Sequence, residues 1–416
     1  MRTSPILLLV VTGTLLGLTS AEAPINVCCM AYTTVNNTLY VQGGSAQKIY
    51  WNSQFFSLDL TLSGWNTSSP PWKALPVGAG VHSAPFENYH SMTATKDKKT
   101  LIVMGSRTRI STYDFSTATW TNDSSFTAGT LMGGAKYPMD LDLTTGLIYI
   151  PSRANNGTAM MVYNHETRTS SIVPMYPSVV LPFRVNSFTF VWSQLRKSFL
   201  FFGGYNSIEG SITFNNYMIE YQPTTYSWTR IPTYGIQGML ASHCMIPAYG
   251  GTKMVVFGGW EGLAGVPTQA PGYSSVLYIL DVKEMNWTKL SEGQVLGRRD
   301  MACAVIGDNF VTWGGMDSER QTAGALIYNL KTNQWTDTYI ATVDESLSSS
   351  SLRMYIGVGL TAGVVLGGLV AWLVFRCKRS KATTVHNVAY EQVSSRSATP
   401  RDLQDGKTAM QWSPYR

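Results

Sequence analysis

Short apolar runs, rich in β-branched and aromatic residues, recur through residues 25–342 and alternate with clusters of turn residues. The runs come in pairs that are joined by a short polar turn such as NN, DKK, TTG or GDN. The second run of each pair ends in small residues, and the six copies read TLYVQGG, TLIVMGS, GLIYIPS, KSFLFFGG, KMVVFGG and NFVTWGG. This composition and punctuation predict pairs of buried antiparallel strands that are joined by tight turns.

An eight-residue phrase follows each strand pair. It begins with an aromatic residue or Leu and, in five of its six copies, ends with Trp seven positions later. The copies are LDLTLSGW at 58–65, YDFSTATW at 113–120, YNHETRTS at 163–170, YQPTTYSW at 221–228, LDVKEMNW at 280–287 and YNLKTNQW at 328–335. Their starts lie 48 to 59 residues apart, which predicts a repeat architecture. We interpret the phrase as the third strand of a unit, its turn, and the first residue of the fourth strand.

Four-stranded units of this kind bury both faces when they stack around an axis. The Trp side chains are suited to fill the gaps between neighbouring sheets, and the Gly pairs allow close approach of the backbone. The residues that we assign to this structural role are Gly43, Gly44, Trp65, Trp120, Gly203, Gly204, Trp228, Gly258, Gly259, Trp287, Gly314, Gly315 and Trp335.

The set of Gly-Gly after an apolar strand, then an aromatic residue and Trp seven apart, resembles the kelch repeat. The best matches are RRDMACAVIGDNFVTWGG at 298–315 and KMVVFGGW; the second and third units lack the Gly pair, and the third also lacks the Trp. The resemblance covers about residues 25–342 and implies an all-β fold, a six-bladed kelch β-propeller that we place at 22–342. No strand exchange that would close the ring between the first and last units is evident in the sequence.

Two further apolar segments flank this region. MRT, ILLLVVTGTLLGL and TSAEA are typical of a signal peptide, which we place at 1–21, an uncleaved anchor being the alternative. Residues 354–375 contain no charge, and a helix of this length, about 33 Å, matches a hydrocarbon core of about 30 Å. Basic residues follow at once, so a transmembrane helix of type I orientation is predicted, with a Ser-rich linker at 343–353 and a disordered cytoplasmic tail at 376–416.

Composition and charge favour a cell-surface glycoprotein. Aromatic residues are 12% of the chain and charged residues only 13%. The tail holds eight Lys and Arg against three Asp and Glu, so most of the net charge of +6 belongs to it. Such a tail is attracted to anionic membrane lipid, and nothing in the charge pattern favours nucleic acid as a partner. Five N-glycosylation sequons precede the transmembrane segment, at Asn36, Asn66, Asn122, Asn156 and Asn286.

Four of the five cysteines lie in the repeat region and are expected to meet an oxidising compartment. Cys28 or Cys29 in the first unit could form a disulfide with Cys303 in the sixth and so clasp the ring. Cys244 is the competing partner of Cys303. A vicinal Cys28–Cys29 bridge and buried free thiols are the remaining alternatives.

The sequons predict which face of the propeller binds a partner. Asn36 and Asn286 fall in the turns between strands one and two and strands three and four, Asn66 and Asn122 are expected near the same face, and Asn156 lies in a loop on the other. That other face also carries the longest loops, where binding sites usually arise. We expect it to bind an extracellular protein or glycan through residues that include Trp72, Tyr205, Trp260, Glu261 and Tyr273, although aromatic residues of this kind also pack their own loops.

An enzymatic alternative follows from the same resemblance, because kelch propellers are similar to the central domain of galactose oxidase, a copper-radical enzyme. Tyr89 and His90 resemble one ligand segment of that family, with His243 and Cys244 as further candidates. Both histidines occupy the same place in their repeats, and no second Tyr-His pair exists. Structural histidines are therefore the favoured reading, with no cofactor or metal and no enzymatic activity predicted.

Three signals concern the membrane and the tail. Gly359, Gly363 and Gly367 form a small-residue ladder on one face of the predicted helix, which favours a homodimer. Cys377, just inside the membrane, is a candidate for palmitoylation. Tyr390 opens YEQV, which resembles an endocytic sorting signal, so a sorting receptor is a further alternative.

Overall fold

The computed structural model describes residues 23–46, 51–105, 109–123, 138–152, 159–174, 185–208, 211–235, 238–262, 272–319 and 324–342. The chain forms two compact units, Met1–Asp344 and Glu345–Arg416, and all described residues belong to the first. In this part no helix has the length and apolar character to cross a membrane. The predictions for the signal peptide, Asn156, the linker, the transmembrane helix with its glycine ladder, Cys377 and the tail lie outside the described residues.

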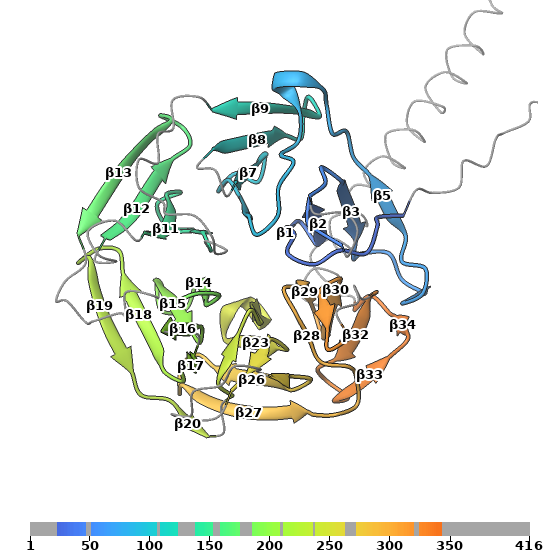
Figure 1. Cartoon of the computed structure of the whole chain (residues 1–416), viewed down its shortest axis with the longest axis vertical. Helices are drawn as coiled ribbons and strands as arrows, with labels where there is room; N and C mark the ends of the chain where they lie inside the picture. Colours follow the sequence, from blue (N-terminus) through green and yellow to red (C-terminus); the bar gives the residue numbers. More distant parts are fainter. Residues whose placement is uncertain are drawn as a thin grey trace, which may run out of the picture. The chain divides into compact units, whose positions relative to one another are not determined.

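The regular secondary structure of the described residues consists of β-strands apart from two short 3-10 helices, η1 (Gly80–His82) and η2 (Tyr249–Gly251), which confirms the all-β prediction. They include six antiparallel sheets around a central axis, one for each unit of the repeat (Figure 1), and we call these sheets blades one to six. From the axis outward, blade one consists of β1 (Ala31–Val35), β2 (Thr38–Gln42), β3 (Phe55–Asp59) and β5 (Trp72–Ala74). Blade two consists of β6 (Ser91–Ala94), β7 (Thr100–Met104), β8 (Ile110–Asp114) and β9 (Thr119–Asp123). Blade three consists of β10 (Asp140–Leu141), β11 (Ile148–Ser152), β12 (Ala159–Asn164) and β13 (Thr169–Pro174).

The remaining blades follow the same order. Blade four consists of β14 (Thr189–Ser193), β15 (Ser198–Phe202), β18 (Met218–Gln222) and β19 (Ser227–Ile231). Blade five consists of β22 (Cys244–Ala248), β23 (Lys253–Phe257), β26 (Leu277–Asp281) and β27 (Asn286–Ser291), with β20 (Tyr234–Gly235) added in parallel outside β27. Blade six consists of β29 (Ala302–Ile306), β30 (Asn309–Trp313), β32 (Leu326–Asn329) and β33 (Gln334–Thr336). The innermost strands contact one another in the order β1, β6, β10, β14, β22, β29 and back to β1.

The apolar core is divided among the gaps between blades. Each of the six hydrophobic clusters in the described residues joins two neighbouring blades, for example Leu200 of blade four with Val256 of blade five. A four-stranded sheet has two apolar faces, and radial stacking removes both from water. This burial stabilises the fold by about 25 cal/mol for each Å² of apolar surface.

The repeated phrase has the register that its spacing predicts. The Trp of the fourth strand stands opposite the first residue of the phrase in four of the blades, as in the pairs Tyr113–Trp120 and Tyr221–Trp228. The Trp then reaches the preceding blade: Trp287 lies 4.8 Å from Phe202, measured between ring centroids. Trp120, Trp228, Trp287 and Trp335 thus act as spacers inside or between blades, as predicted.

Blade one departs from the prediction. The fourth strand is β5, in which Trp72 stands opposite Leu58, and Trp72 packs edge-on against Trp313 of blade six at 5.0 Å. Trp72 therefore takes the spacer position, and its assignment to the ligand face was wrong, since it is 5% exposed. Trp65, predicted to begin the fourth strand, lies instead in a separate two-residue strand, β4 (Trp65–Asn66).

That separate strand closes the ring. β4 pairs with β34 (Thr338–Tyr339) at the end of the described chain, and the rings of Trp65 and Tyr339 are stacked 4.7 Å apart. The buried Tyr339 hydroxyl donates a hydrogen bond of 2.7 Å to the carbonyl oxygen of Leu60. Residues from opposite ends of the propeller are thereby joined without a covalent bond, although the sequence showed no strand exchange.

The Gly pairs hold neighbouring blades together through the backbone. Gly314 and Gly315 have φ angles of 70° and 90°, and the Gly315 N–H donates to the Val27 carbonyl of blade one at 2.9 Å. A Cβ on Gly314 would lie 2.4 Å from that same oxygen. Both observations require glycine, because a side chain strains the left-handed conformation and has no room. The pairs at 43–44, 203–204 and 258–259 make the equivalent hydrogen bond to the next blade.

The disulfide joins Cys244 and Cys303, whose Cα atoms are 6.5 Å apart. These residues lie on β22 and β29, the adjacent innermost strands of blades five and six. The predicted clasp from Cys28 or Cys29 to Cys303 is therefore wrong, and the competing partner is the one observed. Cys28 and Cys29 precede β1 and are buried free thiols.

Candidate binding surface on the loop face

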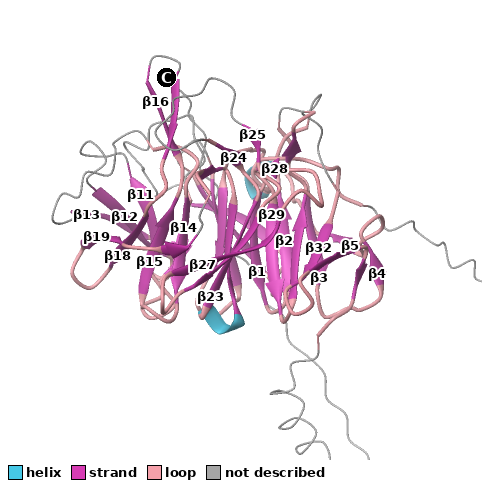
Figure 2. Ribbon diagram, turned by 90° about the horizontal axis from the view of Figure 1, so that it is seen from below, coloured by secondary structure: helices cyan, strands magenta, loops and turns pink. Residues whose placement is uncertain are grey.

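The blades present two different faces (Figure 2). One, the turn face, carries tight turns such as η2 (Tyr249–Gly251) between strands one and two of blade five. The other, the loop face, carries the connections between strands two and three and between successive blades. Three small sheets rise there: β16–β17 (Tyr205–Ile208 and Ser211–Phe214), β21–β24–β25 (Leu240–Ala241, Trp260–Glu261 and Gly272–Tyr273) and β28–β31 (Arg298–Arg299 and Met316–Asp317).

These small sheets bring together four of the five residues predicted for the ligand face. Trp260 is the Cα partner of Tyr273, and its ring lies 5.8 Å from that of Tyr205, measured between centroids. Tyr205, Trp260, Glu261 and Tyr273 are all partly exposed. We call Tyr205, Trp260, Glu261, Tyr273 and Arg299 the loop-face cluster.

Arg299 is the member that sequence reasoning missed. Its guanidinium carbon lies 4.5 Å from the centroid of the Trp260 ring, a cation–π arrangement, and it forms an ion pair with Asp300. Burial opposes the charge of Arg299, but the Asp300 carboxylate and the Tyr273 and Tyr89 hydroxyls outweigh it and raise its pKa. The cluster therefore holds a fixed positive charge beside aromatic rings. The only sequence signal was the position of RRD directly before an innermost strand.

The neighbouring Arg298 has a different role. It is 5% exposed, and its Nη1 donates to the carbonyl oxygens of Gly324 at 2.7 Å and Gly314 at 3.3 Å. Burial lowers its pKa to about 10. Arg298 thus holds the loop-face connections of blade six in place, whereas Arg299 reaches the surface.

A ring of left-handed residues surrounds the axis below the cluster. Cys29, Tyr89, Ser187, Ser242 and Asp300 precede the innermost strands of five blades and have φ between 53° and 66°. Their backbones are linked from blade to blade, since the Tyr89 N–H donates to Cys29 at 2.7 Å and the Cys29 N–H to Asp300 at 2.9 Å. Cys29 therefore occupies a backbone position that turns the chain into β1. Its burial raises the pKa of the thiol, while the hydrogen bond from Cys29 lowers that of Cys28.

The residues named for a copper-radical site serve other purposes. Cys244 is in the disulfide, His90 Nε2 bonds to Gln42 Oε1 at 2.5 Å, and His243 Nε2 bonds to Thr189 Oγ1 at 3.0 Å. In the described part of the chain, no group of three or more His, Cys, Asp and Glu side chains could hold a metal ion.

The two histidines occupy one repeated position. The His90 ring lies against the position that a Cβ of Gly43 would take, and His243 lies in the same way against Gly203. Methionine takes this place in blade six, where the Met301 side chain lies against Gly258. The two histidines and Met301 therefore share one structural role, which is to fill the space beside the Gly pair.

The sequons are distributed differently from the prediction. Asn36, Asn66, Asn122 and Asn286 are all exposed. Asn36 lies in the β1–β2 turn on the turn face, but Asn122 pairs with Ser111, near the loop-face end of β8. The expectation that Asn122 lies near the turn face was therefore wrong, and the loop face carries this site at the rim of blade two.

Comparison with known proteins agrees with the geometry. The family model described as the KLHDC2/KLHL20/DRC7 Kelch-repeats domain matches residues 157–370, just over half of the 416 residues. Multiple epidermal growth factor-like domains protein 8 of Mus musculus is 28% identical over 194 residues, which are 42% of this chain and only 6% of that protein's length. The solved structure of YjhT has a TM-score of 0.55 and 12% identity, over 76% of this chain and 98% of the other, so the likeness concerns the fold. The repeat, the blades and the family model together place this chain in the kelch-repeat family.

Proposed function

We propose that this chain is a single-pass type I cell-surface glycoprotein whose six-bladed kelch propeller binds an extracellular protein or glycan through the loop face. Membership of the kelch-repeat family supports a binding module, because kelch domains generally mediate protein binding. The weak similarity to a protein named for epidermal growth factor-like domains fits a location at the cell surface. The four exposed sequons and the predicted signal and transmembrane segments fit the same proposal.

The loop-face cluster is the observation that carries the proposal. Small sheets hold Trp260, Tyr205 and Tyr273 in place, and Arg299 stacks on the Trp260 ring. Rigid aromatic side chains lose little entropy on binding, and Trp, Tyr and Arg are the residues that most often dominate binding energy. The same rings could stack on the apolar face of a sugar, and Arg299 and Glu261 could bind its hydroxyl groups.

The experiment measures binding to the full-length chain displayed on cells. The probes are fluorescent glycosaminoglycans, fluorescent N-glycans and a panel of purified extracellular protein domains. We expect at least one probe to bind saturably and Trp260→Ala to weaken its affinity by about tenfold or more, as for a central aromatic contact. Tyr234→Ala is the matched control, because Tyr234 is 63% exposed and lies outside the loop-face cluster, next to the start of β27.

Two results would contradict the proposal. One is binding that Trp260→Ala leaves unchanged, which would place the partner site elsewhere on the propeller. The other is an equal loss in both variants, which would show a general effect of removing a surface ring. Glycosidase treatment of the same cells tests the glycoprotein prediction, since each occupied sequon adds mass that the enzyme removes.

A further inference from the structure

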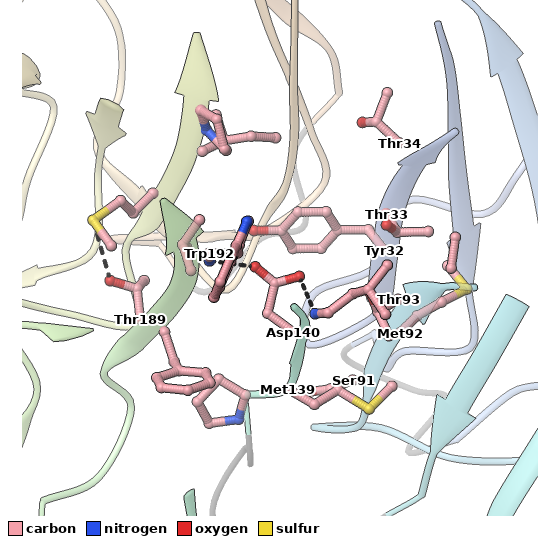
Figure 3. A pocket seen from close by; sticks show the side chains of 18 of the residues that line it. Tyr32, Thr33, Thr34, Ser91, Met92, Thr93, Met139, Asp140, Thr189 and Trp192 are labelled. Atoms are coloured by element: carbon pink, nitrogen blue, oxygen red, sulfur yellow. Dashed lines mark hydrogen bonds between the residues drawn. The ribbon is translucent and has the colours of Figure 1, made fainter. Parts of the chain in front are cut away.

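A cavity of about 410 Å³ lies along the propeller axis, and the innermost strands of all six blades contribute to its wall. This volume is within the range of sites that bind small molecules. Its lining includes a carboxylate, several hydroxyl groups and aromatic side chains, some of which are labelled in Figure 3. None of the five residues of the loop-face cluster lines this cavity.

Asp140 supplies the carboxylate. It is the first residue of β10, the two-residue innermost strand of blade three, and its side chain points toward blade four (Figure 3). Oδ2 accepts a hydrogen bond of 2.6 Å from the Trp192 backbone N–H, and Oδ1 accepts one of 2.8 Å from the Leu141 N–H. The Thr93 side chain is a further donor. These bonds fix the carboxylate at the cavity wall and leave part of its acceptor capacity unused.

No cation balances this charge among the described residues. Asp140 has no ion pair with Lys, Arg or His there. Burial raises the pKa of Asp140 to about 6, so the group is still mostly ionised at neutral pH. His243, which lines the same cavity, is neutral because burial lowers its pKa to about 3. The cavity wall therefore holds a carboxylate that is hydrogen-bonded but has no ion-pair partner among the described residues.

Aromatic side chains line the same cavity as the carboxylate. Trp192 and Tyr32 belong to the lining, and Figure 3 shows both side chains beside Asp140 in this view. Burial, then the charges of Asp300 and Asp140, raise the pKa of the Tyr32 hydroxyl, so this ring stays neutral. The faces of Trp and Tyr attract cations most strongly where water is excluded.

Two polar atoms of the lining also lack partners. The Nδ1 atom of His243, a residue that is 6% exposed, and the Oγ1 atom of Thr34 are enclosed without a hydrogen bond. Buried polar atoms are normally satisfied by protein or by ordered water, so both atoms are available to water or to a bound molecule in the cavity. Both residues line the axial cavity.

We propose that the axial cavity binds a small organic cation, with Asp140 as its counter-charge and the rings of Trp192 and Tyr32 as its aromatic contacts. An ammonium group meets both requirements, since it pairs with the carboxylate and lies against the rings. Lys96 and Lys98 line the turn-face end of the cavity and repel cations there. The ligand is therefore expected to enter from the loop face, where the one acidic residue at that end of the lining, Asp300, is paired with Arg299 and the lining includes no Lys.

The test is isothermal titration calorimetry on the purified full-length chain with 1,4-diaminobutane and tetramethylammonium as probes. We expect saturable binding of at least one cation and none of 1,4-butanediol, which has the same length as the diamine but no charge. Asp140→Asn removes the charge but keeps the shape of the side chain and one oxygen that can accept from one of the two backbone donors. We expect at least about tenfold weaker binding. Asp142→Asn is the matched control, because Asp142 is buried two residues away but does not line the cavity.

A second measurement needs no variant. Below about pH 6 the affinity of the unmodified protein for the cation should fall by about tenfold per pH unit, and above it the affinity should level off. The other charged or titratable groups that face the cavity are Tyr32, His90, Lys96, Lys98, His243 and Asp300. If Asp140→Asn does not fold, this profile still decides the question. No cation binding, equal binding of the diol, or an affinity unaffected by Asp140→Asn would overturn the proposal.

Discussion

Ring closure by Tyr339 offers the sharpest test of the fold. The Tyr339 side chain is fully buried, its ring stacks on Trp65, and its hydroxyl donates to Leu60 in the first blade. Tyr339→Phe removes the hydroxyl alone, whereas Tyr339→Ala removes the ring as well. The two variants therefore separate the hydrogen bond from the packing that joins the ends of the propeller.

The expected magnitudes follow from these contacts. Tyr339→Phe leaves the buried Leu60 carbonyl without its donor and should cost about 1–2 kcal/mol of unfolding free energy. Tyr339→Ala also leaves a cavity and removes an aromatic stack, so the total should be about 4 kcal/mol. For a domain of this size each kcal/mol lowers the Tm by about 2 °C, which predicts a decrease of about 8 °C for the Ala variant.

The assay is thermal unfolding of the full-length chain, with urea unfolding as a second measure. Ile340→Ala is the matched control, because Ile340 is the next residue and is 58% exposed. We expect it to change the unfolding free energy by less than about 0.5 kcal/mol. If Tyr339→Ala behaves like Ile340→Ala, the β4–β34 pairing does not hold the ring closed and the reasoning fails.

Three further predictions concern other parts of the propeller. Gly314→Ala should lower the unfolding free energy measured in urea by at least about 2 kcal/mol more than Gly293→Ala does. The two glycines have similar φ angles, 70° and 74°, but only at Gly314 would a Cβ meet a backbone carbonyl of blade one. Cys303→Ser opens a disulfide with Cys244 that spans 59 residues and should cost about 4 kcal/mol of unfolding free energy in the loop-entropy model. Non-reducing peptide mapping of the unmodified chain should recover this pair, and a peptide that links Cys303 to Cys28 or Cys29 would contradict it. Asp140 has a folded-state pKa of about 6, above its unfolded value of about 3.9, so its protonation stabilises the fold below about pH 4 and this stabilisation is lost as the pH rises through 6. Unfolding free energies measured from pH 4 to 7 should therefore fall by up to about 3 kcal/mol more for the unmodified chain than for Asp140→Asn, and parallel profiles would contradict the assignment.

The strands and blades could be predicted from the sequence because their signals are local. An apolar run that ends in Gly-Gly, such as KMVVFGG, indicates both a buried strand and the turn that follows it within seven residues. The Trp spacing in units such as YDFSTATW places Trp120 opposite Tyr113 through a short turn, so register follows from counting residues. No distant part of the chain is needed for these decisions.

The first unit shows where counting fails. Trp65 and Trp72 both follow Leu58 and are seven residues apart, so the sequence offers two candidates for one spacer position. Trp65 has the spacing of the other units, but its ring stacks on Tyr339. Trp72 occupies the spacer position instead and packs against Trp313. The choice is made by residues more than 200 positions away, which no local pattern contains.

The candidate sites divide in the same way. Tyr205, Trp260, Glu261 and Tyr273 could be named from long loops on one face, but the stacking of Arg299 on Trp260 depends on how two blades meet. Asp140 carried no signal in the sequence, since YPMDLDL resembles any strand.

The amino-acid sequence by itself determined the all-β class, the repeat and the positions of most strands, because alternation, turn residues and glycine requirements act within a few residues. Only the tertiary structure decided the pairing of Cys244 with Cys303, the closure of the ring at Tyr339 and the enclosure of Asp140 on the axis. Each of these depends on the distance between residues from different blades. That distance is set by the radial packing of the whole propeller.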